Sequence, residues 1–145
     1  MGCDPSVLRP RRREPRTPVY EPDEHTSQAA LIEWRDTLVG PFPELGMLLA
    51  IPNGGWRAKQ VAKRLKAEGV QPGACDLVLL VPMGEHHGLF VEMKTAAGRA
   101  TAAQRRFIAA ARAHGYRAEV CHSWPEAARL ICAYLGLPPD AAPER

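Results

Sequence analysis

Residues 73–96 read GACDLVLLVPMGEHHGLFVEMKTA, and this stretch decides how the rest of the chain is interpreted. Two apolar runs flank a turn at GEHHG, which predicts a β-hairpin. Asp76 opens the first strand, and Glu92 and Lys94 close the second. Charged residues are poor strand formers and are seldom buried unpaired, so these three either lie on a wet face or form a site.

The pairing of this hairpin decides whether the charges meet. Side chains alternate between the two faces of a strand, so Glu92 and Lys94, two residues apart, share a face, while the apolar side chains before them take the other, buried face. Opposed residues in a simple antiparallel pairing have numbers that sum to roughly 170 here, which sets Asp76 across from Glu92 and Lys94. Such Cβ atoms lie about 5 to 8 Å apart. Spacing alone therefore predicts two carboxylates and one ammonium in a small volume.

Hairpin geometry leaves two interpretations of this trio open. Two nearby carboxylates repel unless something positive lies between them, and hard oxygen ligands suit magnesium or manganese. A metal between phosphate and water is typical of phosphodiester cleavage, and the lysine can place or deprotonate the water and stabilise developing charge. The alternative is a cross-strand salt bridge on an exposed face, which adds little stability.

The rest of the chain supplies helices and two further strands. We expect a helix over 23–39, a strand at 47–51, a basic helix over 57–68, the hairpin at 76–95, a helix after Thr101, a strand at 116–122 and a helix ending at Leu135. This order predicts an α/β fold with a mixed, roughly four-stranded sheet flanked by helices. The hairpin is antiparallel, and the last strand, entered through a crossover helix, is expected to be parallel to its neighbour.

The two ends of the chain differ from this domain. Residues 1–22 hold five prolines and five arginines, which predicts a disordered basic arm. The folded domain is expected over 23–136, and a flexible tail over 137–145.

Composition narrows the class of protein. The 145 residues are 46% hydrophobic, enough for one domain with a core, and the net charge of +3 is too small to indicate a nucleic-acid partner by itself. The four cysteines include no CxxC pair, so zinc is not expected. No signal peptide or membrane-spanning stretch is recognised, so we expect reduced thiols and a cytoplasmic, not secreted, protein.

Several segments in order resemble one nuclease family. GACD and FVEMK resemble the PD-(D/E)XK superfamily, and EHTSQ, IPNGGWR, KRLKAEGVQPGACD, TAAQRRF and HGYRAEVCHSWPEAARLICAYL resemble its VRR-NUC (virus-type replication-repair nuclease) family over about residues 22–136. The resemblance implies a restriction-endonuclease-like core and a bacterial or phage-infected cell. The chain departs from the pattern at Cys75, where proline is usual, and we expect Cys75 to be a small structural residue.

The resemblance also implies site residues and a cofactor. A divalent cation, Mg²⁺ or Mn²⁺, would be bound by Asp76, Glu92 and the main-chain carbonyl of Met93. Lys94 would be the catalytic lysine. Gln104 would sit beside the metal, and Glu24 would reach the site from the first helix.

The expected DNA contacts are more widely spread. The resemblance favours Asn53, Arg57 and Lys63. Gln28 shares the face of Glu24 on the first helix, and helical spacing adds Lys59 and Lys66 to Lys63. The lysines would form a ridge on the basic helix, opposite a core face with Val61 and Leu65. A basic helix is also commonly a solvated face.

The function implied is a metal-dependent DNA endonuclease that acts on branched DNA, including four-way (Holliday) junctions, as a homodimer in DNA repair. In-line attack of water on the phosphorus would leave a 5′-phosphate. The alternatives are a nuclease for flaps, single strands or duplex, and an inactive DNA-binding protein on the same fold. We expect neither zinc nor a membrane among its partners.

Overall fold

The structure of the protein, a computed structural model, describes residues 22–52 and 59–144. The expected basic arm, apart from Pro22, and the candidate DNA contacts Asn53 and Arg57 lie outside these residues.

Helices and strands follow one another in the expected order. They are α1 (Glu24–Leu38), the 3₁₀ helix η1 (Pro43–Met47), β1 (Leu48–Ala50), α2 (Lys59–Ala67), β2 (Leu77–Leu79), β3 (Leu89–Met93), α3 (Ala102–Ala113), β4 (Arg117–Cys121), α4 (Trp124–Leu135) and the 3₁₀ helix η2 (Pro139–Ala141). The Asp23 and Thr101 side chains cap α1 and α3, since each accepts a hydrogen bond from the first turn of its helix.

The sheet is mixed, as predicted. Its strand order is β1-β2-β3-β4, with the first two pairings antiparallel and the β3–β4 pairing parallel. In the hairpin Leu77 lies opposite Val91. Continuing this register by one residue brings Asp76 opposite Glu92, which confirms the predicted proximity.

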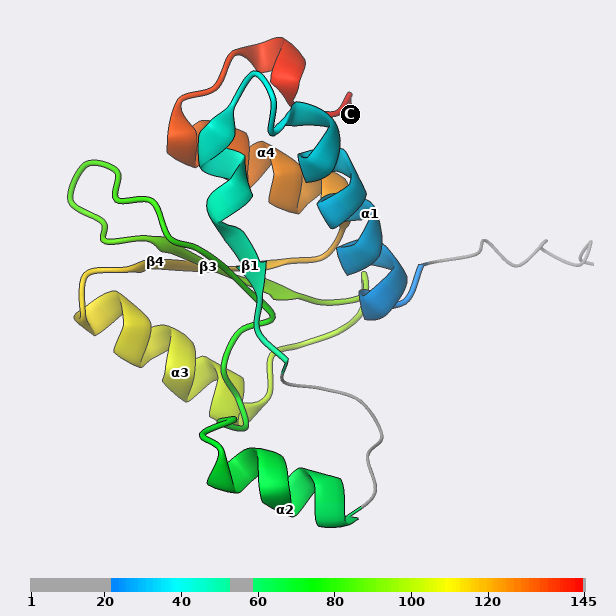
Figure 1. The fold of residues 1–145 in the computed structure, drawn as a ribbon, viewed down its shortest axis with the longest axis vertical. Helices are drawn as coiled ribbons and strands as arrows, with labels where there is room; N and C mark the ends of the chain where they lie inside the picture. Colours follow the sequence, from blue (N-terminus) through cyan, green and yellow to red (C-terminus); the bar gives the residue numbers. More distant parts are fainter. Residues whose placement is uncertain (1–21, 53–58, 145) are drawn as a thin grey trace, which may run out of the picture.

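Helices cover both faces of this sheet (Figure 1). On the face covered by α1 and α4, Leu31 and Ile131 pack in one cluster with Met93. On the other face, Ile108 of α3 packs in a second cluster with Ala118 of β4. The sequence predicts only one buried face for the hairpin, and this is wrong for β3 because α3 covers its second face.

Arginines from two helices contact the outer edges of the sheet. The Leu48 carbonyl of β1 faces away from β2, because Met47 and Ile51 bond to residues that directly flank β2. This carbonyl accepts a 2.7 Å hydrogen bond from Arg35 of α1. At the opposite edge Arg112 of α3 donates two bonds, of 2.6 and 3.0 Å, to the Ala118 carbonyl of β4.

Helix α2 lies apart from this core, beyond the N-terminal end of α3 (Figure 1). The sequence predicts Val61 on a core-facing side, but Val61 is 47% exposed and only Leu65 is half-buried. The expectation for Val61 is wrong because the described residues leave that side of α2 exposed. The described part of the chain contains no helix with the length and apolar character needed to cross a membrane.

The segment expected to be a flexible tail contains η2. Ala141 is buried there, and its carbonyl accepts a 3.1 Å hydrogen bond from the indole of Trp34 in α1. An apolar contact and one hydrogen bond thus attach this segment to α1. The prolines and small side chains of the segment predict a flexible tail.

Candidate active site

The structure brings together the charged residues that the hairpin pattern singles out. Asp76 directly precedes β2, Glu92 lies in β3 and Lys94 directly follows it. The Asp76 Oδ2 atom accepts a 2.8 Å hydrogen bond from the main-chain N–H of Met93. Because N–H and C=O groups of one strand residue point to the same side, the Met93 carbonyl faces the edge where Asp76 lies.

Glu92 is the centre of this cluster and its side chain is fully buried. Its Oε1 atom lies 2.8 Å from Lys94 Nζ and also accepts a hydrogen bond from the amide of Gln104 in α3. Its Oε2 atom is buried and has no hydrogen-bond partner among the residues that the structure describes. A buried carboxylate oxygen without a partner is unfavourable, so this atom is the unsatisfied position of the site.

Gln104 has two functions that sequence reasoning did not combine. The spacing of Thr101 and Gln104 indicates a helix cap, and both hydrogen bonds of a capping box are present: Thr101 Oγ1 accepts from the Gln104 N–H, and Gln104 Oε1 accepts from the Thr101 N–H. Because Oε1 is used by the cap, the amide of Gln104 is directed at Glu92. The signal for this is the T-x-x-Q pattern, which begins eight residues after the end of β3.

Lys94 is almost completely buried and lies between two carboxylates. Besides Glu92, its Nζ contacts Glu24 Oε1 at 3.1 Å, which brings the first turn of α1 into the site as expected. Burial alone would lower the pKa of Lys94, but its hydrogen bonds to Glu92 and Glu24 outweigh burial and raise that pKa. Lys94 is therefore held as an ammonium that donates hydrogen bonds.

Burial disfavours the charged form of the two carboxyl groups, Glu92 and Asp76. Burial raises the pKa of Glu92 to about 7, and the nearby Asp76 charge adds to the effect, while the bond from Lys94 opposes it. Burial also raises the pKa of Asp76 against the hydrogen bond from Met93. Both groups thus hold their negative charge at a cost, which a cation between them would remove.

The donor set fits a divalent cation of the magnesium type. Two carboxylates and a peptide carbonyl are hard oxygen ligands, and Mg²⁺ commonly binds one or two carboxylates and keeps several waters. No group of three His, Cys, Asp or Glu side chains in the described ranges could hold a metal by itself. A cation here would therefore depend on Asp76, Glu92 and the Met93 carbonyl, with its remaining positions left to water or substrate.

Cys75, beside Asp76, is not a nucleophile in this arrangement. It is fully buried, and burial, with the Glu92 and Asp76 charges adding to it, raises the pKa of its thiol to about 12. A neutral buried thiol packs as a small apolar group, as we expect from the sequence.

The proposed DNA contacts do not join this cluster. Gln28 is partly buried on α1, one turn from Glu24. Lys63 and Lys66 are exposed on α2, and the Lys59 side chain lies outside the described part of the chain. The structure neither supports nor contradicts their contact with DNA.

Sequence reasoning did not explain why glycine stands at position 73. Gly73 has φ +90°, and a Cβ atom there would lie 2.7 Å from the Cβ of Ala103 in α3. The loop that leads to Asp76 therefore packs directly on the first turn of α3, next to Gln104. The Pro72–Gly73 dipeptide signals a turn, but nothing in the local pattern indicates its partner.

Comparison with known proteins agrees with this geometry. The sequence profile of the VRR-NUC domain matches residues 24–125, which is more than half of the chain and spans every residue of the cluster. A solved structure described as a VRR_NUC domain protein is similar with a TM-score of 0.69 and 25% identity, over 82% of this chain and 93% of that one. No curated protein matches the chain. The chain belongs to the VRR-NUC nuclease family, and its mixed sheet between helices is consistent with a restriction-endonuclease-like fold.

Proposed function

We propose that this protein is a divalent-metal-dependent DNA endonuclease whose active site is the Asp76, Glu92 and Lys94 cluster. The observation that carries the proposal is the state of Glu92. Its side chain is fully buried, one oxygen is bound by Lys94 and Gln104, and the other has no partner in the described structure. A carboxylate held in this way, beside a second one, is arranged to bind a cation.

Each residue has a part in the proposed chemistry. Asp76, Glu92 and the Met93 carbonyl would hold Mg²⁺ or Mn²⁺, which when bound polarises the phosphate and promotes ionisation of water. Lys94 would orient the attacking water and donate to the oxygen that gains charge in the transition state. Glu24 and Glu92 fix the ammonium of Lys94 from two sides. Gln104 fixes the carboxylate of Glu92.

Branched DNA and a homodimer are the finer parts of this proposal. They rest on the resemblance to short VRR-NUC nucleases, and four-way junctions are the substrate that it favours. A symmetric dimer would carry two sites related by a two-fold axis, which suits paired cuts in a symmetric junction.

The test is a cleavage assay over duplex, flap, fork, single-stranded and four-way junction DNA, with Mg²⁺, Mn²⁺ or a chelator. We expect metal-dependent cutting that is fastest on the junction. Sedimentation of the same sample measures whether two chains assemble. Protein with Lys94→Ala, prepared in parallel, controls for contaminating nucleases.

The possible results separate the alternatives. Equal cutting of all substrates would support the nuclease function but contradict the proposed preference for junctions. Binding without cutting under every metal condition would favour an inactive DNA-binding protein on this fold.

A further inference from the structure

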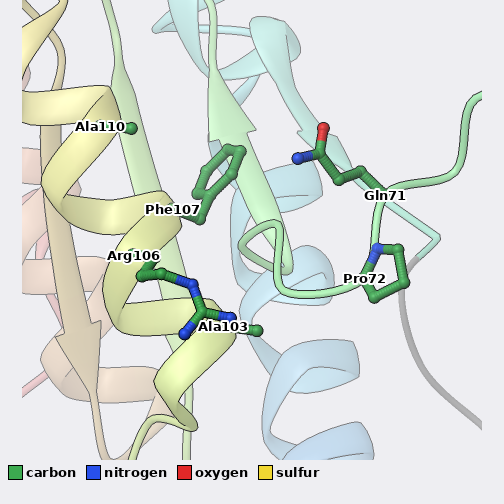
Figure 2. A pocket seen from close by; sticks show the side chains of 6 residues that line it. All are labelled: Gln71, Pro72, Ala103, Arg106, Phe107 and Ala110. Atoms are coloured by element: carbon green, nitrogen blue, oxygen red, sulfur yellow. The ribbon is translucent and has the colours of Figure 1, made fainter.

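A hollow of about 320 Å³ opens beside the active site, between α3 and the loop that follows α2 (Figure 2). Its lining consists of Gln71, Pro72, Ala103, Arg106, Phe107 and Ala110.

The hollow shares two segments of the chain with the active site. Ala103 lines the hollow, and the next residue, Gln104, bonds to Glu92. On the opposite wall, Pro72 lies four residues before Asp76, and Gly73 holds this loop against Ala103. The lining on α3 extends from Ala103 to Ala110, about 10 Å at about 1.5 Å per residue. A ligand in the hollow would thus lie close to whatever reacts at Glu92.

The chemistry of the lining suits a planar, aromatic and anionic ligand. The Phe107 ring projects from α3, and Pro72 and two alanines add apolar surface (Figure 2). The Gln71 amide and the Arg106 guanidinium stand at the rim. Neither side chain has a hydrogen bond or ion pair with any residue in the described ranges, and both residues are exposed. A free amide can bond to the edge of a base, and a free guanidinium can bind a phosphate.

The size of the hollow limits the ligand to one nucleotide. Binding sites for small ligands span roughly 300–1,000 Å³, and the hollow is at the lower end of that range. A base inside a duplex is stacked on both sides and cannot enter such a space, whereas an unpaired base can leave the stack at modest cost.

We propose that this hollow binds one unpaired nucleobase of the substrate strand, with Phe107 and Pro72 against its faces, Gln71 at its edge and Arg106 on the neighbouring phosphate. The inference rests on the proposed nuclease function and names what the site selects. DNA with an unstacked base next to the cut, as at a branch point, would fill the hollow, and continuous duplex would leave it empty.

The test needs variants that fill the hollow without disturbing the core. Phe107 is unsuitable, because its ring packs edge-on against Phe90 with centroids 5.2 Å apart. Ala110 is exposed and lines the hollow, so Ala110→Phe fills it from the surface. Ala109 is also exposed on α3 but does not line the hollow, so Ala109→Phe is the matched control.

The measurement uses 2-aminopurine placed at each unpaired position of a branched DNA bound to Lys94→Ala protein. We expect the fluorescence to change at one position. Ala109→Phe should keep that response, and Ala110→Phe should abolish it and weaken binding about tenfold, as expected for one lost stacking contact. Gln71→Ala and Arg106→Ala should each reduce the response, which keeps the test valid if Ala110→Phe does not fold.

Failure of this inference differs from failure of the proposed function. No responding position, or a response that survives Ala110→Phe in a folded protein, would overturn the nucleobase site. If the protein with unmodified site residues does not cleave DNA but the 2-aminopurine response is intact, the proposed nuclease function is overturned and the nucleobase site stands.

Discussion

Lys94 after β3 and the lysines of α2 carry the same ammonium group in opposite surroundings. Lys94 is 6% exposed, with carboxylate oxygens 2.8 and 3.1 Å away on two sides. Lys63 and Lys66 are exposed on a helix that lies apart from the core. A buried ammonium loses solvation and is held by its partners, so it can act at one fixed point. An exposed one is screened by salt and can contribute only to binding. The two regions should therefore respond differently to substitution.

The largest effect is expected for Lys94→Ala. Cleavage should fall by about 10²–10³-fold or more, because the change removes the donor that stabilises transition-state charge. DNA affinity should stay within a few fold, since it arises mainly from scattered phosphate contacts. Single-turnover cleavage and a binding titration measure the two quantities. Cutting at the wild-type rate would contradict the assignment of a catalytic role to Lys94.

Neutralising a carboxylate should abolish activity and stabilise the metal-free protein. The pKa of Glu92 is raised from 4.5 to about 7. The stability that protonated Glu92 contributes is present below pH 4.5 and lost as pH rises through about 7. Glu92→Gln should thus gain stability over the wild type between pH 5 and 8, by at most about 3 kcal/mol. Melting curves recorded with chelator at pH 5 and at pH 8 measure this gain.

Asp76→Asn is the companion variant, with a smaller gain expected in the same direction. Mg²⁺ should raise the melting temperature of the wild type and not that of Glu92→Gln. A lower melting temperature for either variant at pH 8 would support a structural salt bridge instead of a metal site.

Gln104→Ala should weaken metal binding without removing the site. Loss of a group that orients a ligand typically reduces metal affinity or activity by about 10–100-fold. Thr101→Ala is the control, because it removes half of the capping box but keeps Gln104 at Glu92. Both changes should lower helix stability by about 1 kcal/mol. Only Gln104→Ala should raise the Mg²⁺ concentration needed for half-maximal cleavage, and an equal rise in both variants would assign the effect to the cap.

Gly73→Ala and Gly69→Ala compare the loop at the site with the end of α2. Both glycines have positive φ, +90° and +98°, so both changes introduce backbone strain of about 1 kcal/mol. Only at Gly73 would the added methyl group meet another atom, Ala103. We expect Gly73→Ala to lower the melting temperature by several degrees more than Gly69→Ala and to slow cleavage as well. Equal effects would mean that the loop shifts freely.

The smallest effect is expected on α2. Changing Lys59, Lys63 and Lys66 together to alanine should weaken binding of every DNA structure alike. Each lost phosphate contact should reduce the salt dependence of binding by about one unit of slope. Cleavage of bound DNA should persist at excess protein. An unchanged slope would move the expected DNA path to Arg99, Arg105 and Arg106 near the active site.

The same comparison shows what a sequence can predict. Period-two alternation and turn position fixed the register that brings Asp76 to Glu92, because both are local properties of a hairpin. The complete burial of Glu92 was not predictable, since it depends on α3 packing over the second sheet face. The prediction that Val61 faces the core failed for the converse reason. Its helical spacing indicates a side of α2 that could be buried, but only the tertiary fold determines whether another element covers that side.

The arginines at the two edges of the sheet bear on how copies of this protein meet. An open strand edge offers unpaired carbonyls that can template pairing with another chain, which leads to aggregation. Arg35 occupies the outward Leu48 carbonyl of β1, and Arg112 occupies the outward Ala118 carbonyl of β4. Each guanidinium takes an acceptor that an incoming strand would need, and each is itself paired with a carboxylate, Arg35 with Asp36 and Arg112 with Glu119. A second copy that approached either edge would therefore lack one backbone acceptor, so contact between copies should form through side chains and not by extending the sheet.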